Sequence, residues 1–503
     1  FISIVTDPDN FFSSETGIYV TGTNGVRGDC DGTIRNLNRD WERPINLEFY
    51  EMDGIPRINQ EAGVKIFGGC SRTRYPQKSL ALFARSEYED GDFDYQFFED
   101  KEIDSFESLI LRSSADDQVS TMIKDAYSQY VQIGQMDIDY MAYRPVVVFL
   151  NGEYWGIHNL REKLNEHFIA DNHGIEKDKI TILDRNASVI IGNDRNDYTN
   201  LLNFVESTNL SNSNAYAQVR EMMDIDQYID YQIANIYMAE VDWPGNNIKY
   251  WKANTPGKKL WRWLVFDRDQ TFQTYRIPVN ALDLATNPSF GWPNPKWSTV
   301  LFSRLQTSQA FNNQFIQTYA YHLTTTFEPN RLIDIANEFK MRIAPEIPRH
   351  IGRWGGQIDP DFNEGWNISP TFDSYEKWSD NIDSIQTFAV KRPEFAISNL
   401  ENHFGLDGMA TLNVNNNSSE SGKILLFNTI NLGNTPFSGE FFKEVPITFT
   451  ALPKIGFEFS HWIISVAGEE NVVETSELNL TLNDSTDLNA VFVTQTQLDG
   501  PII

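Results

Sequence analysis

The sequence predicts an α+β protein with two domains, residues 1–405 and 406–503. Three observations predict this class. Short strand patterns separated by Gly and Asn turns fill the first part of the chain, helical spacing dominates from about 295 to 403, and only short, regularly spaced strand patterns follow Gly405. At 503 residues the chain is long enough for a large core and more than one domain.

Strand patterns and one helical pattern occupy the first part of the chain. Four segments bounded by turn residues predict strands: GIYVTG, WERPINLEFYEMDG, GVKIFGG and SLALFAR. After them, apolar residues recur at helical spacing in SADDQVSTMIKDAYSQYVQIG. That spacing predicts a helix with one buried face.

Two hairpins and a buried helix are predicted in the middle of the chain. RPVVVFLNGEYWGIHNL predicts a hairpin because Asn151-Gly152 joins two apolar strands and favours a tight turn. Residues 224–241 place apolar side chains at helical spacing, which predicts a buried helix leading into Asp242. A second hairpin follows, with IKYWKA and KLWRWLVF as strands and TPGKK as the turn.

The last hundred residues differ in composition from the rest. From about 295 to 403, helical spacing and frequent aromatic residues predict a helical lobe packed on the preceding part. The polar, turn-rich stretch NVNNNSSESG follows a boundary that we place near residue 406. Five short strand patterns then predict a small all-β domain: KILLFNTI, VPITFTAL, FEFSHWII, LNLTL and NAVFV.

Composition limits the partners and the compartment. The net charge of -29 is distributed along the chain, which argues against nucleic acid and anionic lipid surfaces. No apolar run reaches the roughly eighteen residues of a membrane helix, and a chain that begins with Phe1 predicts a processed product. Cys30 and Cys70 exclude a four-cysteine zinc site and form either one disulfide or two free thiols; with the high Asn, Thr and Ser content they agree with export.

Acidic and amide side chains gather at the ends of two apolar segments. Asp242 and Asn247 follow the predicted buried helix, and Asp267 and Asp269 follow the last strand of the second hairpin. Phosphoryl transfer needs a carboxylate to orient the attacking hydroxyl, and an amide and further carboxylates to hold divalent cations. The D-x4-N and D-x-D pattern fits this chemistry, although Asp residues also cap helices and turns.

A glycine-rich and basic loop precedes the strand SLALFAR. Gly68 and Gly69 allow the main chain to approach an anion closely. Three cations follow within seven residues: Arg72, Arg74 and Lys78. Such a loop either grips the phosphates of a nucleotide or neutralises nearby carboxylates at the surface.

Five segments, in order, resemble the successive signatures of the CotH (spore coat protein H) family of atypical kinases: GGCSRTRYPQKSLALFAR, LRSSADDQVSTMIKDA, VVVFLNGEYWGIHNLREKLNEHF, DWPGNNIKYWKA and WRWLVFDRDQTF. The resemblance runs from about TDPDNFF to about residue 405. It implies a divergent, two-lobed kinase-like domain over residues 1–405. It also implies that ATP and Mg²⁺ or Mn²⁺ are used to phosphorylate Ser or Thr hydroxyls of proteins.

The resemblance implies roles for residues that bind the nucleotide. Lys78 occupies the lysine position of the family's PQKS or PKKS motif and would bind phosphate, with Gly68, Gly69 and Arg72 beside it. Glu162, in LREK, matches a glutamate that pairs with that lysine or faces the nucleotide.

The resemblance also implies roles at the two acidic motifs. Asp242 matches the candidate catalytic base, and Asn247 matches a metal ligand. Asp267 and Asp269 match the family's D-x-D, with Asp267 as the leading metal ligand. The family's glycine soon after D-x-D is absent from DRDQTFQTY, which predicts a more restricted metal-binding loop. Further family positions are explained by a helix cap and an exposed ion pair: Arg112, Asp116, Asp117 and Lys124.

The C-terminal segment resembles small repeat modules of bacterial surface proteins, including the internalin B-repeat type. This resemblance implies a secreted, periplasmic or cell-surface bacterial protein whose module is a spacer or binds a surface glycan or protein. The main alternative is a catalytically inactive kinase-like surface protein, in which Trp292 either stacks on a sugar or lies in the core. A structural coat protein, which needs neither metal nor nucleotide, is a third reading.

Overall fold

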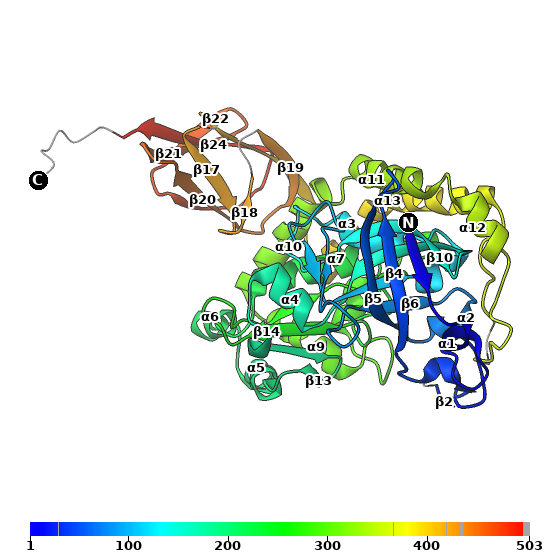
Figure 1. Ribbon diagram of the computed structural model, residues 1–503. Helices are drawn as coiled ribbons and strands as arrows, with labels where there is room; N and C mark the ends of the chain where they lie inside the picture. The colour runs from blue at the N-terminus through cyan, green and yellow to red at the C-terminus, as the bar shows by residue number, and fades with distance from the viewer. Residues whose placement is uncertain (29, 366, 419, 433–435, 496–503) are drawn as a thin grey trace, which may run out of the picture.

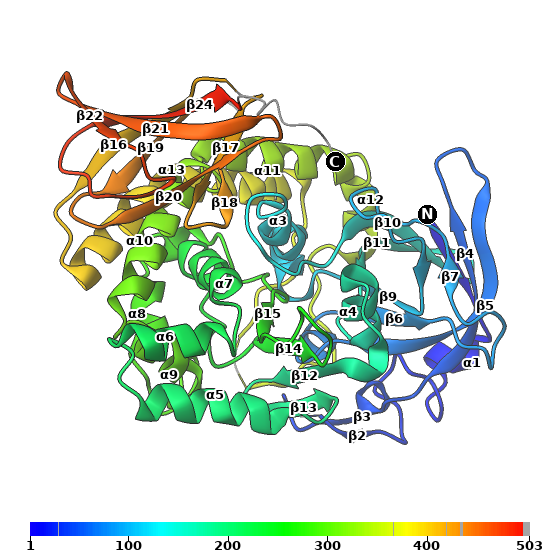
Figure 2. The ribbon, with the colours of Figure 1, turned by 90° about the vertical axis from the view of Figure 1, so that its left-hand side faces the viewer.

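The computed structural model describes residues 1–28, 30–365, 367–418, 420–432 and 436–495 (Figure 1). Its secondary structure is mixed α and β, as the sequence predicts. Figures 1 and 2 show the N-terminal strands on one side of the molecule, the C-terminal sheets on the other, and the long helices between and behind them. Among the described residues, no helix combines the length and apolar character that crossing a membrane requires.

The N-terminal strands close into a barrel in the order β1-β10-β11-β9-β6-β5-β4. Their bounds are β1 (Ile2–Val5), β4 (Arg43–Tyr50), β5 (Pro56–Phe67), β6 (Ser79–Phe83), β9 (Ser108–Arg112), β10 (Tyr143–Leu150) and β11 (Glu153–Glu162). Alternate apolar side chains such as Phe49, Leu82 and Val148 fill the barrel core. The predicted hairpin between β10 and β11 is confirmed. Asn151 and Gly152 both adopt positive φ, which the tight turn requires.

One predicted strand is wrong. The GIYVTG segment forms bends instead, because its main chain folds back onto the helix α1 (Pro8–Phe12). Ile18 and Tyr19 donate their main-chain N–H groups to Asn10 and Phe11 at 3.0 Å. Two short strand pairs complete this region: β2 (Val26–Arg27) with β3 (Ile34–Arg35), and β7 (Phe93–Asp94) with β8 (Ser105–Phe106).

The helix predicted at residues 114–134 is shorter than expected. A 3-10 turn at Ala115–Val119 precedes α3 (Lys124–Tyr130). The buried carboxylate of Asp117 accepts the main-chain N–H groups of Thr121 and Lys124, at 3.1 and 3.0 Å. These side-chain bonds replace helical ones, so the helix begins only after them.

The buried helix and second hairpin of the middle region are confirmed. The helix α7 (Ile225–Tyr237) is capped by Asp224, and β14 (Lys249–Ala253) pairs with β15 (Arg262–Leu264). These two strands extend β12 (Ile180–Asp184) and β13 (Ser188–Ile191) into one four-stranded sheet. The surrounding helices are α4 (Glu166–His173), α5 (Arg195–Ser207), α6 (Ser213–Arg220) and α8 (Ala281–Thr286).

The predicted helical region is present between residues 296 and 404. It contains α9 (Lys296–Leu305), α10 (Gln309–Thr324), α11 (Pro329–Ile343), α12 (Ile347–Trp354) and α13 (Tyr375–Phe404). The connection between α12 and α13 passes along the barrel near α2 (Ser71–Arg74), at the right of Figure 1. Asp359 in this connection donates its main-chain N–H to Arg74 at 2.8 Å.

From Met409 onward the described elements are strands in two sheets. The five-stranded sheet contains β16 (Met409–Asn416), β19 (Phe437–Phe442), β21 (Phe457–Val466), β22 (Glu469–Val473) and β24 (Thr486–Thr494). The four-stranded sheet contains β17 (Gly422–Leu426), β18 (Ile430–Asn431), β20 (Ile447–Pro453) and β23 (Glu477–Leu480). Gln317 of α10 donates to the main-chain oxygens of Phe442 and Val445, both at 2.8 Å. The domain boundary near 406 stays a prediction.

Cys30 and Cys70 form a disulfide. Of the two alternatives that the sequence left open, the structure therefore has the oxidised one. The bridge ties the loop between β2 and β3 to the glycine-rich loop before α2. A structural disulfide is typical of compartments outside the cytoplasm.

Removing this disulfide is expected to lower the free energy of unfolding by about 2–4 kcal/mol. The reason is that a cross-link over a separation of 40 residues restricts the unfolded chain. Denaturant unfolding with and without reductant measures the effect. The Cys30→Ser/Cys70→Ser variant should unfold at the same denaturant concentration as the reduced wild type, and reductant should not change its midpoint. A wild-type midpoint that reductant leaves unchanged would contradict this expectation.

Candidate active site

The structure brings Asp242, Asn247, Asp267 and Asp269 to one place. The β14–β15 hairpin explains this, because the start of β14 lies beside the end of β15 in an antiparallel pair. Asn247 donates its amide N–H₂ to the Asp242 carboxylate at 3.1 Å and to the main-chain oxygen of Asp267 at 3.3 Å. The D-x4-N and D-x-D motifs therefore form a single cluster.

The Asp242 carboxylate is held by three hydrogen bonds. Trp292 donates its indole N–H to Oδ1 at 2.7 Å, and the amides of Asn246 and Asn247 donate to Oδ2 at 3.1 Å. Burial raises the pKa of Asp242, and the bonds from Trp292 and Asn246 oppose that shift. The charge of Asp267 raises the same pKa further. The carboxyl is therefore oriented and is a stronger proton acceptor than an ordinary aspartate.

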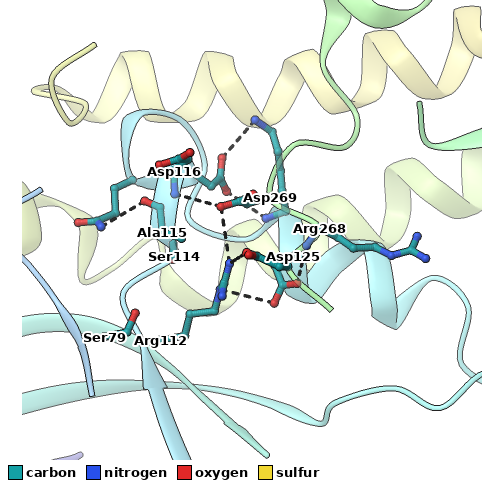
Figure 3. Close-up of polar contacts among 12 residues, drawn as sticks. Ser79, Arg112, Ser114, Ala115, Asp116, Asp125, Arg268 and Asp269 are labelled. Carbon is teal, nitrogen blue, oxygen red and sulfur yellow. Dashed lines mark hydrogen bonds and ion pairs between the residues drawn. The ribbon is translucent and has the colours of Figure 1, made fainter. Parts of the chain in front are cut away.

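Arg112, at the end of β9, is the cation inside the cluster. Figure 3 shows it between Asp269 and Asp125. Its guanidinium hydrogen bonds to Asp267, lies 3.6 Å from Asp269 and lies 3.7 Å from Asp125. Asp269 also accepts the main-chain N–H of Asp116 at 3.0 Å. Burial, and next the charge of Asp267, raise the pKa of Asp269 well above its usual range despite Arg112.

Asp125 contacts the residues that hold this cluster in place. It forms an ion pair with the fully buried Arg161 and accepts the main-chain N–H of Arg268 at 2.9 Å. Burial raises the pKa of Asp125, but the charges of Arg161 and Arg112 outweigh it and hold the value at about 2. Asp125 is therefore ionised at neutral pH and fixes the main chain between Asp267 and Asp269.

Two site residues have a left-handed main-chain conformation. Asn247 and Asp267 have φ values of 48° and 54°, a region that few residues other than glycine adopt and that Asn and Asp adopt more often than the rest. Such conformations concentrate at functional sites, where surrounding contacts hold them.

A family model described as CotH kinase protein matches residues 64–396. The chain belongs to the CotH kinase family. A search of curated proteins found no match. All five resembling segments lie inside the matched range, and the two C-terminal sheets lie outside it.

The structure of this member of the family separates Lys78 from Glu162. Lys78 is 2% exposed, and its ammonium contacts Asp359 and, at 2.6 Å, the main-chain oxygen of Tyr75. Glu162 instead forms a buried ion pair with Lys101. Of the two roles that the resemblance implies for Glu162, the pair with Lys78 is not formed, because Lys78 pairs with Asp359 and Glu162 with Lys101; a position facing the nucleotide stays a prediction.

Arg74 connects the glycine-rich loop to the acidic cluster, by which we mean Asp242, Asn247, Asp267 and Asp269. Arg74 forms ion pairs with Asp116, whose main-chain N–H bonds Asp269, and with Glu364 at 3.0 Å. Gly68 adopts a φ of 101°, which explains the glycine there, and Arg72 lies on α2. Arg74 and Lys78 thus neutralise nearby carboxylates, which was the alternative reading of this basic loop.

The sequence explained Arg112 by a helix cap or an exposed ion pair, but its side chain is only 11% exposed; the sequence patterns pointed to neither Lys163 nor Lys249. The ammonium of Lys249 lies 4.5 Å from the ring centre of Phe266, and that of Lys163 lies 5.4 Å from the ring centre of Phe83. Burial lowers the pKa of both lysines. In the part of the chain that the structure describes, neither ammonium forms a hydrogen bond or ion pair. Neither ammonium is therefore neutralised by a direct carboxylate partner among the described residues.

The acidic cluster fits a divalent cation in its donor chemistry. Among the described residues, no three His, Cys, Asp or Glu side chains form a ready-made cation site. However, Asn247 uses its amide nitrogen in both of its contacts, which leaves the amide oxygen for a cation. The negative charge of Asp267 raises the pKa of Asp269, and a divalent cation such as Mg²⁺ or Mn²⁺ would relieve this repulsion.

Proposed function

We propose that this CotH kinase transfers the γ-phosphoryl group of ATP to Ser or Thr hydroxyls of proteins. The observation that carries the proposal is the oriented Asp242 carboxylate beside Asp267 and Asp269, in a member of a kinase family. In this proposal the barrel and the helical region are the two lobes of a kinase-like domain over residues 1–405.

Asp242 is the catalytic base. The acceptor oxygen attacks the γ-phosphorus, a new oxygen–phosphorus bond forms, and the bond to the bridging oxygen breaks so that ADP leaves with its electrons. The hydroxyl proton goes to Asp242. A carboxylate has about four lone-pair positions, and the three donors on Asp242 leave one for the hydroxyl.

Asp267, Asp269 and Asn247 would hold Mg²⁺ or Mn²⁺, which supplies neutralisation of phosphate charge. Arg112 would keep Asp267 in place through its hydrogen bond. Lys249 and Lys163, whose ammonium groups have no direct carboxylate partner among the described residues, would bind phosphate oxygens.

We also propose that residues of the barrel and of the loops next to it bind the nucleotide. The predicted nucleotide-binding residues are Gly68, Gly69, Arg72, Lys78 and Glu162. Of these, Lys78 reaches a phosphate only if Asp359 releases it, and Glu162 acts through Lys101.

We also propose that the protein works outside the bacterial cytoplasm, secreted, in the periplasm or at the cell surface. The disulfide supports this setting. The two C-terminal sheets, residues 409–494, are then a spacer or a surface that binds a glycan or protein.

Nucleotide binding is expected to need metal. ATP with Mn²⁺ should raise the melting temperature of the full chain, whereas ATP or Mn²⁺ alone should not, because ligands stabilise the state that binds them. Radiolabelled phosphate from ATP should reach an acceptor protein rich in Ser and Thr, and a chelator should stop the transfer. No metal-dependent shift and no transfer would favour the alternative, an inactive kinase-like surface protein.

A further inference from the structure

Two exposed aromatic rings lie on the loop beside Asp242. Phe290 is 113% exposed and Trp292 is 65% exposed. They belong to residues 289–293, SFGWP, which we call the SFGWP loop. The sequence left open whether Trp292 stacks on a ligand or lies in the core, and the structure places it at the surface.

The SFGWP loop is held firmly against the D-x4-N loop. Gly245 donates its main-chain N–H to Pro293 at 2.6 Å, and a Cβ at Gly245 would lie only 2.4 Å from Pro295. Ser289 donates its main-chain N–H to Asn294 at 2.8 Å, and the Asn294 side chain is buried. The main chain that carries the two rings therefore has a fixed place beside the D-x4-N loop.

The two polar side-chain groups of the SFGWP loop are already used in hydrogen bonds. The Ser289 hydroxyl donates to Gly291 at 2.8 Å, and the Trp292 indole N–H donates to Asp242 at 2.7 Å. A sugar would need hydrogen-bonding groups beside the ring on which it stacks, whereas an apolar side chain needs only ring faces. The loop therefore fits an apolar group better than a glycan.

We propose that Trp292 positions the Asp242 carboxylate through its indole N–H, and that the rings of Trp292 and Phe290 bind the acceptor. This inference depends on the proposed function. The acceptor is then a polypeptide segment with an apolar or aromatic side chain next to the phosphorylated Ser or Thr. The rings set acceptor choice, and the indole N–H leaves one carboxylate lone pair directed at the hydroxyl.

Kinetics separate the two roles of Trp292. Trp292→Phe keeps a ring and loses the N–H, so kcat should fall about tenfold with little change in acceptor KM. A kcat equal to that of the wild type would overturn the positioning role.

Acceptor preference tests the second role, in which the rings of Trp292 and Phe290 bind the acceptor; we call these two rings the platform. Trp292→Ala and Phe290→Ala should raise KM about tenfold for a peptide with Leu and Phe beside its single serine, but not for one with Gly in both places. The control is Tyr375→Ala, which removes an exposed ring on α13. Melting temperatures of all variants should match the wild type because these rings are exposed.

Binding without turnover keeps this inference distinct from the proposed function. Fluorescence anisotropy of the labelled Leu/Phe peptide, with a non-hydrolysable ATP analogue and Mn²⁺, should show about tenfold weaker binding to Trp292→Ala than to the wild type. If the wild type binds the peptide but transfers no phosphate, the proposed function and the positioning role fail and the platform stands. Equal binding by the wild type and Trp292→Ala would overturn the platform.

Discussion

Replacing Asp242 with asparagine is expected to lower phosphate transfer by about a hundredfold to ten-thousandfold. Asparagine has the size of the carboxylate but cannot accept the hydroxyl proton. The metal-dependent rise in melting temperature with ATP should remain, because Asp242 is placed beside the acceptor and not on the phosphates. Incorporation of radiolabelled phosphate and the melting curve measure the two properties on the same sample.

Asp267→Asn provides the contrast. It removes the leading metal ligand, so both transfer and the metal-dependent melting shift should be lost. Asp178→Asn is a matched control, because its carboxylate is 72% exposed and pairs only with Lys179 among the described residues. Equal incorporation by the wild type, Asp242→Asn and Asp267→Asn would eliminate both assigned roles.

Asp125→Ala is expected to lower the free energy of unfolding by about 3–5 kcal/mol. The change leaves the fully buried guanidinium of Arg161 without its carboxylate and the main-chain N–H of Arg268 without an acceptor. Denaturant unfolding measures the loss. Asp178→Ala should stay within about 0.5 kcal/mol of the wild type, because exposed positions contribute little. Equal losses in the two variants would refute the buried-pair argument.

The same residue predicts an acid dependence of stability. The folded pKa of Asp125 is about 2, below the ordinary value of 3.8. The stabilisation of the folded protein by ionised Asp125 is therefore complete above about pH 4, and it disappears as the pH falls toward 2. In Asp125→Ala the free energy of unfolding should fall less steeply between pH 4 and pH 2.

A double variant, Asp125→Leu/Arg161→Met, should lose less stability than Asp125→Ala, because no charge is left buried alone.

Local patterns predicted the elements whose contacts are close in sequence. The β10–β11 hairpin follows from Asn151-Gly152, and α7 follows from its apolar spacing. The strand predicted at GIYVTG is wrong because the main chain of this segment hydrogen bonds to α1, a contact that strand patterns do not report. The helix at 114–134 was shortened for a similar reason, since the Asp117 side chain takes over main-chain N–H groups.

The sequence by itself determined the meeting of Asp242 and Asn247 with Asp267 and Asp269, because one short hairpin joins the two motifs and its pairing is local. Only the tertiary structure decided which cation meets which carboxylate. Arg112 contacts Asp267 across 155 residues, and Lys78 contacts Asp359 across 281. A buried charge takes the partner that packing brings nearest, and packing between distant segments leaves no spacing in the sequence.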